Sequence, residues 1–371
     1  MILEPRPKIK PGQYIVWNHM ENFYSLSQND LKNWLKISGY HQDHSQLIFR
    51  QAYRNLETEP WQATGLPLAL PRTAGKAFRC LTPVIDKELI SAYDNSVKFA
   101  LRLEEGQLTE AVLMPESSRI TLCVSSQVGC RQACRFCHTG KMGLIRNLNS
   151  GEMIGQVMAA NAWIQANPWW KTRTGLPESA LVTNVVFMGM GEPLDNLTEL
   201  CRAIEIMLDH HGLALAPRKV TVSTAGHLDG LKVLTEKNYG VGLALSLHET
   251  EQAKRNWLMP INRRYPLADV LNLLKEYTQQ SGKHILIQYT LISGVNDSRD
   301  HARRLAQTLT GIRTRINLIP LNPISANTLS PPDPDSLRSF QQELHEMGLR
   351  SMIRFSKGQD ITAACGQLAY F

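Results

Sequence analysis

The sequence has little that would direct the chain into a membrane or out of the cell. No uninterrupted apolar run approaches the ~20 residues that cross a bilayer. The opening segment, MILEPRPKIKPGQ, carries charges but lacks the apolar stretch of a secretory signal. We therefore expect a cytoplasmic protein with no membrane partner.

The cysteines lack the pattern of a disulfide framework. There are seven, an odd number, in a chain of 371 residues that shows no sign of secretion. Three of them, Cys130, Cys134 and Cys137, stand together in a C-x3-C-x2-C spacing. Inert free cysteines are small apolar residues that normally occur singly, so this grouping indicates ligands of a metal centre.

The number of close ligands bears on the identity of that centre. Thiolates are soft ligands suited to zinc, copper(I) or the iron of iron–sulfur clusters. A structural zinc site needs four ligands, and here His138 or Cys123 would have to supply the fourth. A 4Fe–4S cluster held by three cysteines instead leaves one iron open for another molecule. The three close cysteines are compatible with both such a cluster and a zinc site.

Acidic residues are missing from residues 117–151. The same range holds five basic residues: Arg119, Arg131, Arg135, Lys141 and Arg146. The whole chain has a net charge of +7 and an isoelectric point of about 9.0. An electropositive surface beside the cysteines would attract a phosphate backbone; alternatively, these charges balance an anionic cluster and a cofactor carboxylate.

The chain length predicts one large domain and one small one. Residues 1–90 contain two amphipathic helical patterns, SQNDLKNWLKISGY and HSQLIFRQAYRN, the first capped by Ser27 or Asn29. Residues 64–72, with two prolines and a glycine, are predicted to be a loop or linker. We expect residues 1–90 to form a helical accessory domain.

Residues 91–118 have the pattern of a β-hairpin. Val97, Phe99, Leu101 and Leu103 alternate with other residues before a Glu-Glu-Gly turn and a second extended run. That run leads directly into RITLCVSS, a predicted strand that ends at the cysteines.

From residue 119 onward, short apolar runs alternate with amphipathic helical patterns. The runs cover residues 119–124, 181–190, 218–226, 239–248, 283–292 and 315–323. This alternation is typical of parallel βα units. Six units are too few for a closed eight-unit barrel. The predicted fold class is therefore α/β, with an open partial (β/α)6 barrel over residues 119–349 and a C-terminal strand and tail over residues 350–371.

The most unusual residues follow the predicted strands, at the edge where βα folds bind ligands. They are Gly191, Glu192, Ser223, Ser246, Leu247, His248 and Asn322. Glycine lets backbone amides approach a ligand, Glu192 can accept hydrogen bonds from an ammonium group, and the Ser and Asn side chains can bind hydroxyls or an amino-acid group. Each has a structural alternative as a cap or loop residue, and His248 has one as a packed histidine.

Two further cysteines stand in unusual contexts. Cys365 lies in a C-terminal tail of small residues, and Cys123 shortly precedes the cysteine trio. We predict that these two thiols meet in one site, one as a covalent carrier and the other closing a disulfide on it. Cys80 and Cys201 have no such context and are predicted to be structural.

The cysteine spacing, with Phe136 before the last cysteine, resembles that of the radical S-adenosylmethionine (SAM) enzymes. Further segments follow in order: GMGEPLDN, STAG, SLH, PINRRYP, GVNDS, NLIPLNP and GQDITAACGQL. Together with LCVSSQVGCRQACRFCHTGKMGLIRNL, they resemble the RlmN and Cfr family of RNA adenine methyltransferases over residues 95–371. The resemblance implies a radical SAM barrel with a 4Fe–4S cluster at the cysteine trio and SAM at the strand ends.

The resemblance also implies a reaction that uses two SAM molecules per turnover. One methylates Cys365, and the other, bound to the open iron, is cleaved to a radical that removes a hydrogen from the S-methyl group. The resulting carbon radical adds to carbon 2 of an adenine, and Cys123 releases the product by attacking Cys365. Glu110 matches the family's proton acceptor, with an exposed strand carboxylate as the alternative.

The implied substrates are 23S rRNA and tRNA, contacted in part by the accessory domain, and the implied electron donor is flavodoxin or ferredoxin. We expect a monomer. Methylation at carbon 8, as in the Cfr branch, is one alternative; a zinc-binding RNA-binding protein and a redox-sensing iron–sulfur regulator are alternatives of another class. Two residues depart from the family pattern: Lys357 replaces an arginine common in relatives, and His138 replaces a smaller residue.

Overall fold

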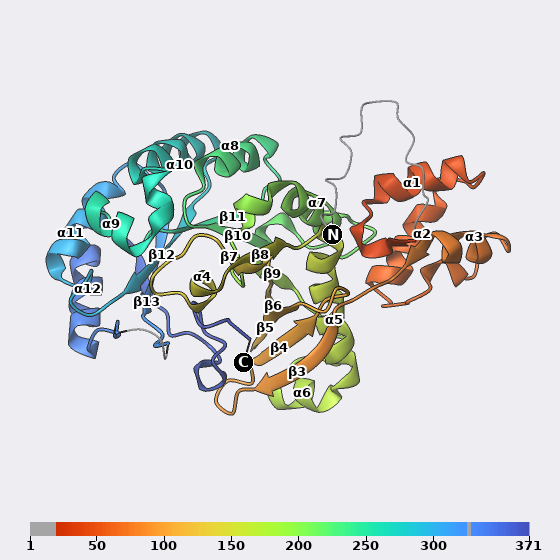
Figure 1. Ribbon diagram of the computed structural model, residues 1–371, viewed down its shortest axis with the longest axis horizontal. Helices are drawn as coiled ribbons and strands as arrows, with labels where there is room; N and C mark the ends of the chain where they lie inside the picture. The colour runs from red at the N-terminus through yellow and green to blue at the C-terminus, as the bar shows by residue number, and fades with distance from the viewer. Residues whose placement is uncertain (1–19, 325–327, 371) are drawn as a thin grey trace.

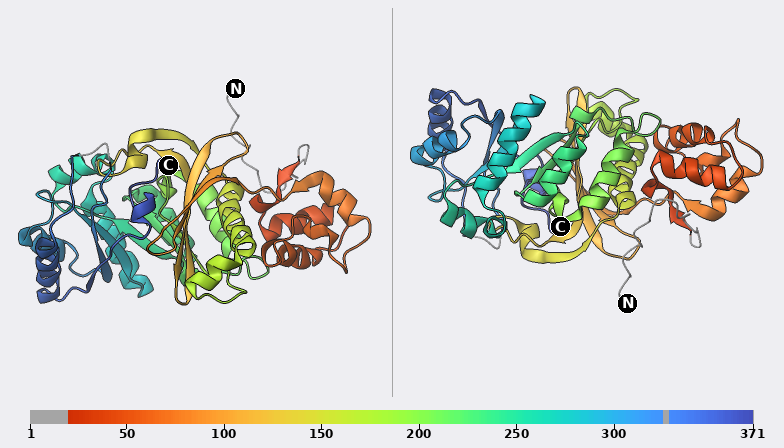
Figure 2. Two further views of the ribbon diagram at one scale, coloured as in Figure 1. Left: turned by 90° about the horizontal axis from the view of Figure 1, so that it is seen from below. Right: turned by 90° about the horizontal axis from the view of Figure 1, so that it is seen from above.

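The computed structural model describes residues 20–324 and 328–370, so residues 1–19 of the predicted accessory domain lie outside the described part. Figure 1 shows a small helical unit, coloured red and orange, at one end of the molecule and a large sheet flanked by helices in the remainder. Figure 2 shows that α5 (Ser150–Ala166) and α7 (Leu197–Leu208), in yellow-green and green, lie between the two parts.

The helical unit contains α1 (Gln28–Ile37), α2 (His44–Tyr53) and α3 (Leu70–Ala77), with short elements β1 (Glu21–Asn22), η1 (Phe23–Ser25), η2 (Pro60–Gln62) and β2 (Phe78–Arg79). Ser27, one of the two predicted caps, begins α1: its hydroxyl accepts from the Asp30 amide, and the Asp30 carboxylate accepts from the Ser27 amide. The linker prediction is wrong from Leu70 onward. Pro71 occupies the first turn of α3, where a missing N–H costs nothing.

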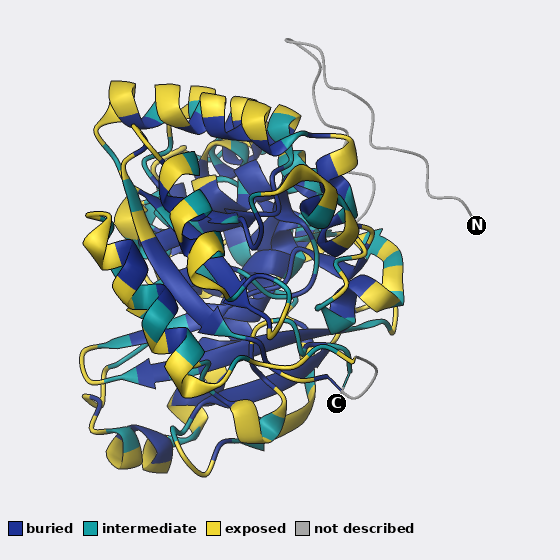
Figure 3. Cartoon of the chain, turned by 90° about the vertical axis from the view of Figure 1, so that its left-hand side faces the viewer, coloured by how far each residue is buried: buried dark blue, intermediate teal, exposed yellow. Residues whose placement is uncertain are grey.

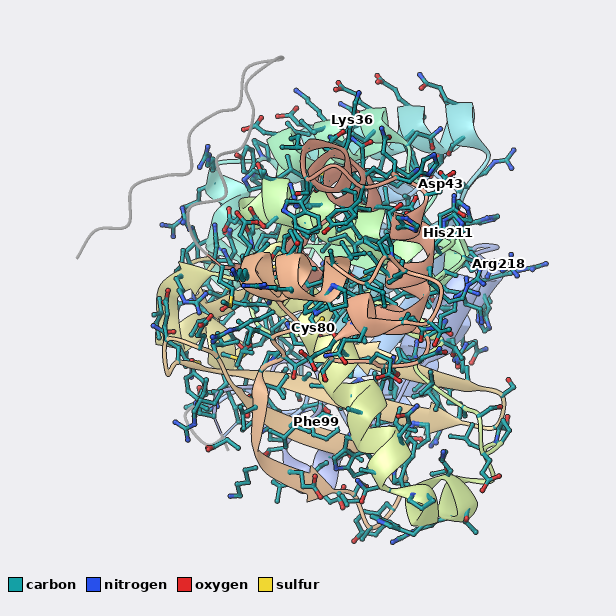
Figure 4. The ribbon with its side chains drawn as sticks, turned by 90° about the vertical axis from the view of Figure 1, so that its right-hand side faces the viewer. Lys36, Asp43, Cys80, Phe99, His211 and Arg218 are labelled. Carbon is teal, nitrogen blue, oxygen red and sulfur yellow. The ribbon has the colours of Figure 1, made fainter. Side chains whose placement is uncertain are left out.

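Polar contacts join the helical unit to the rest of the chain. Gln28 Nε2 lies 2.8 Å from His211 Nδ1, and Arg202 Nη2 lies 2.5 Å from the Asp30 carboxylate. Figure 4 views this junction from the side of the helical unit, with His211 and Cys80 labelled. Burial raises the pKa of the Cys80 thiol to about 12, which fits a structural cysteine.

A ten-stranded sheet forms the centre of the molecule, in the order β14-β13-β12-β11-β10-β9-β6-β5-β4-β3. Seven strands are parallel: β6 (Arg119–Cys123), β9 (Asn184–Phe187), β10 (Val220–Thr224), β11 (Gly242–Ser246), β12 (Ile285–Leu291), β13 (Thr314–Pro320) and β14 (Ser351–Ile353). The antiparallel strands β3 (Val84–Ile90), β4 (Val97–Arg102) and β5 (Leu108–Glu116) extend it. Because β14 and β3 are separate edges, the sheet is open. The predicted α/β fold, an open partial barrel with a hairpin extension, is confirmed.

Two strands refine that prediction. β14 pairs in parallel with β13, so the sheet has a seventh parallel strand beyond the six predicted units. β3 lies at residues 84–90, which the sequence assigned to the helical domain, and it pairs with β4 across a bulge between Ile85 and Lys87. Most of the β3 side chains are exposed or only half-buried at this edge, so the alternation that marks a buried strand is weak there.

The two faces of the sheet differ because the side chains of a strand alternate between them. One face carries apolar side chains, among them Val185, Phe187, Val222, Leu243, Leu245, Ile287 and Leu318. The opposite face carries Cys123, Ser223 and Ser246, and Ser246 is paired in register with Gln288. The predicted polar site residues on β6, β10 and β11 therefore share one face.

Helices cover the apolar face. They are α5 (Ser150–Ala166), α6 (Pro168–Thr174), α7 (Leu197–Leu208), α8 (Leu228–Lys237), α9 (Gln252–Leu258), α10 (Leu267–Ser281), α11 (Arg299–Thr308) and α12 (Pro334–Glu346). The ring of Tyr289 on β12 lies 5.3 Å from that of Phe340 on α12, and Phe99 on β4 lies 5.5 Å from Trp163 on α5. Figure 3 shows the strands buried and the outer surfaces of the helices exposed. No helix in the described residues is long and apolar enough to cross a membrane.

Candidate functional site

The cysteine trio lies on a folded excursion that follows β6. This excursion, here called the cysteine loop, contains β7 (Gln127–Cys130), α4 (His138–Met142) and β8 (Gly143–Asn147). β7 and β8 form a small antiparallel pair. Between Cys130 and Cys137 the chain turns tightly, with the Cys137 amide donating to the Cys134 carbonyl at 3.1 Å. The cysteine ligands are thus carried on a short, closed segment.

The three thiols lie close enough to influence one another. Burial raises the pKa of Cys134 well above its usual value, and the Cys137 and Cys130 thiols raise it further. Burial raises the pKa of Cys130 to about 12, and it raises that of Cys137 as well. A bound metal cation would offset the raised pKa of these thiols, because it stabilises the thiolate form. This donor set fits a thiolate-bound metal centre.

The spacing of the trio bears on the zinc alternative. A single zinc ion with Zn–S bonds of about 2.3 Å holds its sulfur ligands roughly 3.8 Å apart. Among the residues that the structure describes, the group whose ligand atoms all lie within 4.8 Å of one another is Asp209, His210 and His211, and not the trio. The cysteine sulfurs are therefore not gathered as closely as the ligands of a single zinc ion.

Gly189 and Gly191 follow β9 and lie directly against the start of the cysteine loop. A Cβ at Gly189 would stand 2.7 Å from Ser125 Oγ, and one at Gly191 would stand 2.6 Å from the Gln127 Cβ. Gly191 also has a φ of 103°, which disfavours any side chain. The Met190 amide donates to Ser125 Oγ at 2.8 Å. The glycines let the chain that follows β9 pack closely against the residues that follow β6.

Glu192 is buried at the same strand edge, with 3% of its surface exposed. Its carboxylate accepts hydrogen bonds from the Ala225 amide at 2.7 Å and the Leu194 amide at 3.2 Å. Burial raises its pKa to about 7, although these hydrogen bonds act in the opposite direction. The carboxylate therefore joins the end of β9 to the end of β10. A cation bound beside it would stabilise its charged form.

The residues predicted after β10 and β11 lie together at this edge. Ser223 is buried, Ser246 is half-buried, and Leu247 is fully buried with its amide donating to the Gln288 carbonyl at 3.0 Å. His248 has a positive φ of 57°, and its Nδ1 accepts from the Thr290 amide at 2.8 Å.

The ring of His248 connects β11 to the cysteine loop. Burial lowers its pKa to about 3, with Arg255 adding to the effect, so the imidazole is neutral and its proton is on Nε2. Its centroid lies 4.8 Å from that of Phe136 in an edge-to-face arrangement. Phe136 thus has a packing role between the second and third cysteines of the trio.

The C-terminal tail returns to the cysteine loop. The His138 amide donates to the Gly366 carbonyl at 2.7 Å, and Thr139 Oγ1 donates to the Leu368 carbonyl at 2.6 Å. The backbone of His138, one of the two departures from the family pattern, therefore holds the tail. Figures 1 and 2 show this segment, in dark blue, ending near α4 and the hairpin.

Asn322, after β13, also holds the tail. Its Nδ2 donates to the Cys365 carbonyl at 3.1 Å and to Ser356 Oγ at 2.9 Å, and its Oδ1 accepts from Gln359 Nε2 at 3.2 Å. Lys357, the other departure from the family pattern, donates from Nζ to the Pro115 carbonyl. Both residues join the tail to the sheet.

The structure brings Cys123 and Cys365 together. Cys123 is buried at the end of β6 in a small apolar cluster with Val112, Met190, Ala363 and Leu368. Burial raises its pKa, and the nearby Cys365 thiol raises it further. Cys365 is an exposed residue, yet partial removal of its sulfur from water raises the pKa of its thiol. The nearby Arg354 lowers that pKa. Cys137 also acts on Cys365, so the carrier candidate lies near both Cys123 and the third cysteine of the trio.

Glu110 is completely buried on β5, so the alternative of an exposed strand carboxylate is wrong. Its Oε1 lies 2.9 Å from Lys98 Nζ, which is also buried, and Lys98 donates to the Thr362 carbonyl of the tail at 3.2 Å. Register explains the placement, because Lys98 pairs with Val112 and Glu110 pairs with Ala100, on the face that carries Cys123.

Sequence reasoning missed three contributors. Gln127 Oε1 accepts from the Glu192 amide at 2.9 Å, Lys98 pairs with Glu110, and Arg255 on α9 is fully buried against the strand ends. Charged residues inside an apolar run, as Lys98 is in SVKFAL, are a signal that the sequence offers. Arg255 and Gln127 carry no comparable signal.

The sheet is open, three cysteines follow its first parallel strand, and Gly191 and Glu192 follow its second. This arrangement defines the class of radical SAM enzymes. The sequence profile of the Radical SAM superfamily matches residues 124–306. A radical SAM methyltransferase from Sphaerobacter thermophilus has a similar solved structure, with a TM-score of 0.84, 36% identity, and coverage of 94% of this chain and 98% of that one.

Two relatives indicate the family within the class of radical SAM enzymes. A protein of Lawsonia intracellularis named dual-specificity RNA methyltransferase RlmN is 42% identical over 81% of this chain and 83% of its own. One of Campylobacter lari with the same name is 35% identical over 95% of this chain and 98% of its own. The chain belongs to the RlmN family of dual-specificity RNA methyltransferases, and the predicted resemblance is confirmed.

Proposed function

We propose that the protein is a radical SAM RNA methyltransferase that adds a methyl group to carbon 2 of adenine through a methylated Cys365. The observation that carries the proposal is the return of the C-terminal tail to the cysteine loop. The His138–Gly366 and Thr139–Leu368 hydrogen bonds hold the carrier thiol beside the predicted cluster ligands, while Cys123 lies below it.

Each part of the site has one task. Cys130, Cys134 and Cys137 would hold a 4Fe–4S cluster, and Gly191, Glu192, Ser223, Ser246, Leu247, His248 and Asn322 would surround SAM. When bound, the cluster and SAM supply a carbon radical, which an electron-poor ring carbon requires. Cys365 carries the one-carbon unit, and Glu110 accepts the proton lost from the adenine ring, while one electron would return to the iron–sulfur cluster. Cys123 then attacks the Cys365 sulfur: the S–S bond forms, the bond from that sulfur to the one-carbon unit breaks, and the released carbon takes up a proton to become the methyl group.

The substrate is RNA, and we infer 23S rRNA and tRNA as its sources. An adenine must leave its stack to reach a site at the strand ends, which loops and single strands permit at low cost. Residues 117–151 hold five basic and no acidic residues, which favours a phosphate backbone there, although Arg119, Arg131 and Arg146 form ion pairs with Glu116, Asp195 and Glu152 and so contribute less to this attraction. Flavodoxin or ferredoxin as electron donor, the monomeric state and the cytoplasmic location remain predictions.

Nucleoside mass spectrometry tests the reaction. RNA from cells with and without the protein is digested, and 2-methyladenosine is expected only where the protein is present. 8-Methyladenosine in its place would establish the Cfr-type reaction, which the RlmN names of the relatives do not favour. The absence of both would contradict the proposal.

A cysteine variant tests the release step. With Cys123→Ala we expect a covalent RNA–protein adduct to accumulate, because no thiol remains to attack Cys365. Cys80→Ala is the matched control and should form none, since Cys80 lies in the helical unit. Normal product release by Cys123→Ala would refute the resolving role.

A further inference from the structure

The side chain of Arg255 is buried at the strand edge with 0% of its surface exposed. Its guanidinium donates to three backbone carbonyls: those of Ala225 at 2.9 Å, Leu247 at 3.1 Å and Ser246 at 3.3 Å. It also donates to Asn262 Oδ1 at 2.5 Å. Arg255 thus ties together the residues that follow β10 and those at the end of β11.

None of these acceptors carries a charge. In the described part of the chain, no carboxylate forms an ion pair with Arg255, and Glu249 acts on it only from a distance. Removing a guanidinium from water without an ionic partner is unfavourable. Its several N–H groups satisfy these four acceptors, but none of the acceptors balances its positive charge.

The helix that carries Arg255 is joined to the cysteine loop next to Cys134. The Arg135 amide donates to the Leu258 carbonyl at 3.0 Å, and Arg135 Nε donates to the Trp257 carbonyl at 2.8 Å. Both acceptors are in α9. Arg255 also donates to the Leu247 carbonyl, next to His248, whose ring centroid lies 4.8 Å from that of Phe136 between Cys134 and Cys137. The positive charge of Arg255 is therefore held at the strand ends against which the cysteine loop packs.

We propose that Arg255 is a positioning residue whose buried positive charge balances the thiolate-bound cluster and raises its reduction potential. A nearby cation stabilises the more negative, reduced form of a cluster. Because Arg255 itself is shielded from water, its effect is larger than that of an exposed charge at a similar distance. The inference rests on the cluster that the proposed function requires.

The test is a redox titration of the cluster, followed by electron paramagnetic resonance in the purified full-length protein. In Arg255→Gln we expect the ratio of reduced to oxidised cluster at a fixed potential to fall about tenfold, a midpoint shift of about 59 mV to more negative potential. Arg255→Lys keeps the charge and should shift the midpoint much less. Arg135→Gln removes an exposed charge beside the same cysteine and is the matched control, with a smaller shift expected.

A second variant covers the case in which Arg255→Gln does not fold. Asn262→Asp keeps the acceptor of the guanidinium in place but adds a compensating negative charge, and it too should shift the midpoint to more negative potential. An unchanged midpoint in Asn262→Asp, with normal iron content, would overturn the inference and leave Arg255 a purely structural residue. Absence of any cluster in the wild-type protein would instead overturn the proposed function.

Discussion

The cysteine loop and the C-terminal tail both contribute sulfur to the site, but they are held in different ways. The loop is fixed by backbone packing: Gly189 and Gly191 lie against Ser125 and Gln127 at distances that leave no room for a side chain. The tail has little regular structure beyond η6 (Gln359–Ile361), and individual hydrogen bonds from Lys98, Thr139, Asn322 and Gln367 attach it.

This difference matches the tasks proposed for the two regions. Cluster ligands must keep one geometry, and packing of strand ends provides it because any displacement costs many contacts at once. A carrier thiol must meet a methyl donor, a substrate and Cys123 in turn, and hydrogen bonds of about 1 kcal/mol each can be exchanged one at a time. The molecule thus combines a fixed sulfur site and an adjustable one.

The largest effect is expected from substitutions that distinguish the cluster ligands from the carrier thiol. Cys365→Ala should abolish methylated product while the visible absorption spectrum of the cluster stays unchanged, because the tail supplies no cluster ligand. Cys134→Ala should lose both the cluster and the product. Iron and sulfide analysis with nucleoside mass spectrometry measures this, and full turnover by Cys365→Ala would contradict the carrier role.

The packing of the loop is tested by Gly191→Ala. The added methyl group would stand 2.6 Å from the Gln127 Cβ at a φ of 103°, so we expect the free energy of unfolding to fall by about 4 kcal/mol. Gly106→Ala is the matched control: its φ is 86°, but no neighbouring atom lies within 4 Å, and it should cost only about 1 kcal/mol. Equal losses in urea unfolding would show that close packing is unimportant.

The buried carboxylate of Glu192 gives stability a pH dependence. Its pKa is raised from 4.5 to about 7, so between these pH values the folded protein binds the proton more tightly than the unfolded chain does. Stability should therefore fall as pH rises through this window, by roughly 3 kcal/mol in total at about 1.4 kcal/mol per pH unit. Urea unfolding of the SAM-free protein at several pH values measures it. Glu192→Gln should remove this slope, and an unchanged slope in the variant would exclude Glu192 as its source.

The smallest expected effect concerns the tail. Gln367→Ala removes the bonds from Gln367 Nε2 to the Pro323 carbonyl and from the Ala364 amide to Gln367 Oε1. We expect the tail to open about 1 kcal/mol more easily, so that backbone amides of residues 363–368 exchange about fivefold faster with solvent deuterium. Gln342→Ala, which removes a bond to Glu346 on exposed α12, should leave tail exchange unchanged. Equal exchange in the two variants would mean that Gln367 does not restrain the tail.

The amino-acid sequence alone determined the elements whose signals are local. Ser27 caps α1 three residues before its capping partner, the six apolar runs became β6 and β9–β13, and the cysteine spacing marked the trio. Such features depend on side-chain periodicity and on neighbours within one turn or strand. The same locality explains the error at α3. Pro71 was interpreted as part of a loop, although it lies in the first turn of a helix.

Only the tertiary structure decided which distant residues share the site. The burial of Glu110 depends on the register of three antiparallel strands, and Arg255 binds carbonyls at two different strand ends. The meeting of Cys365 with Cys123 depends on single hydrogen bonds between the tail and the cysteine loop. These contacts join segments that are far apart in the sequence and share no periodic pattern. The tertiary fold brings them together, and the local sequence pattern does not.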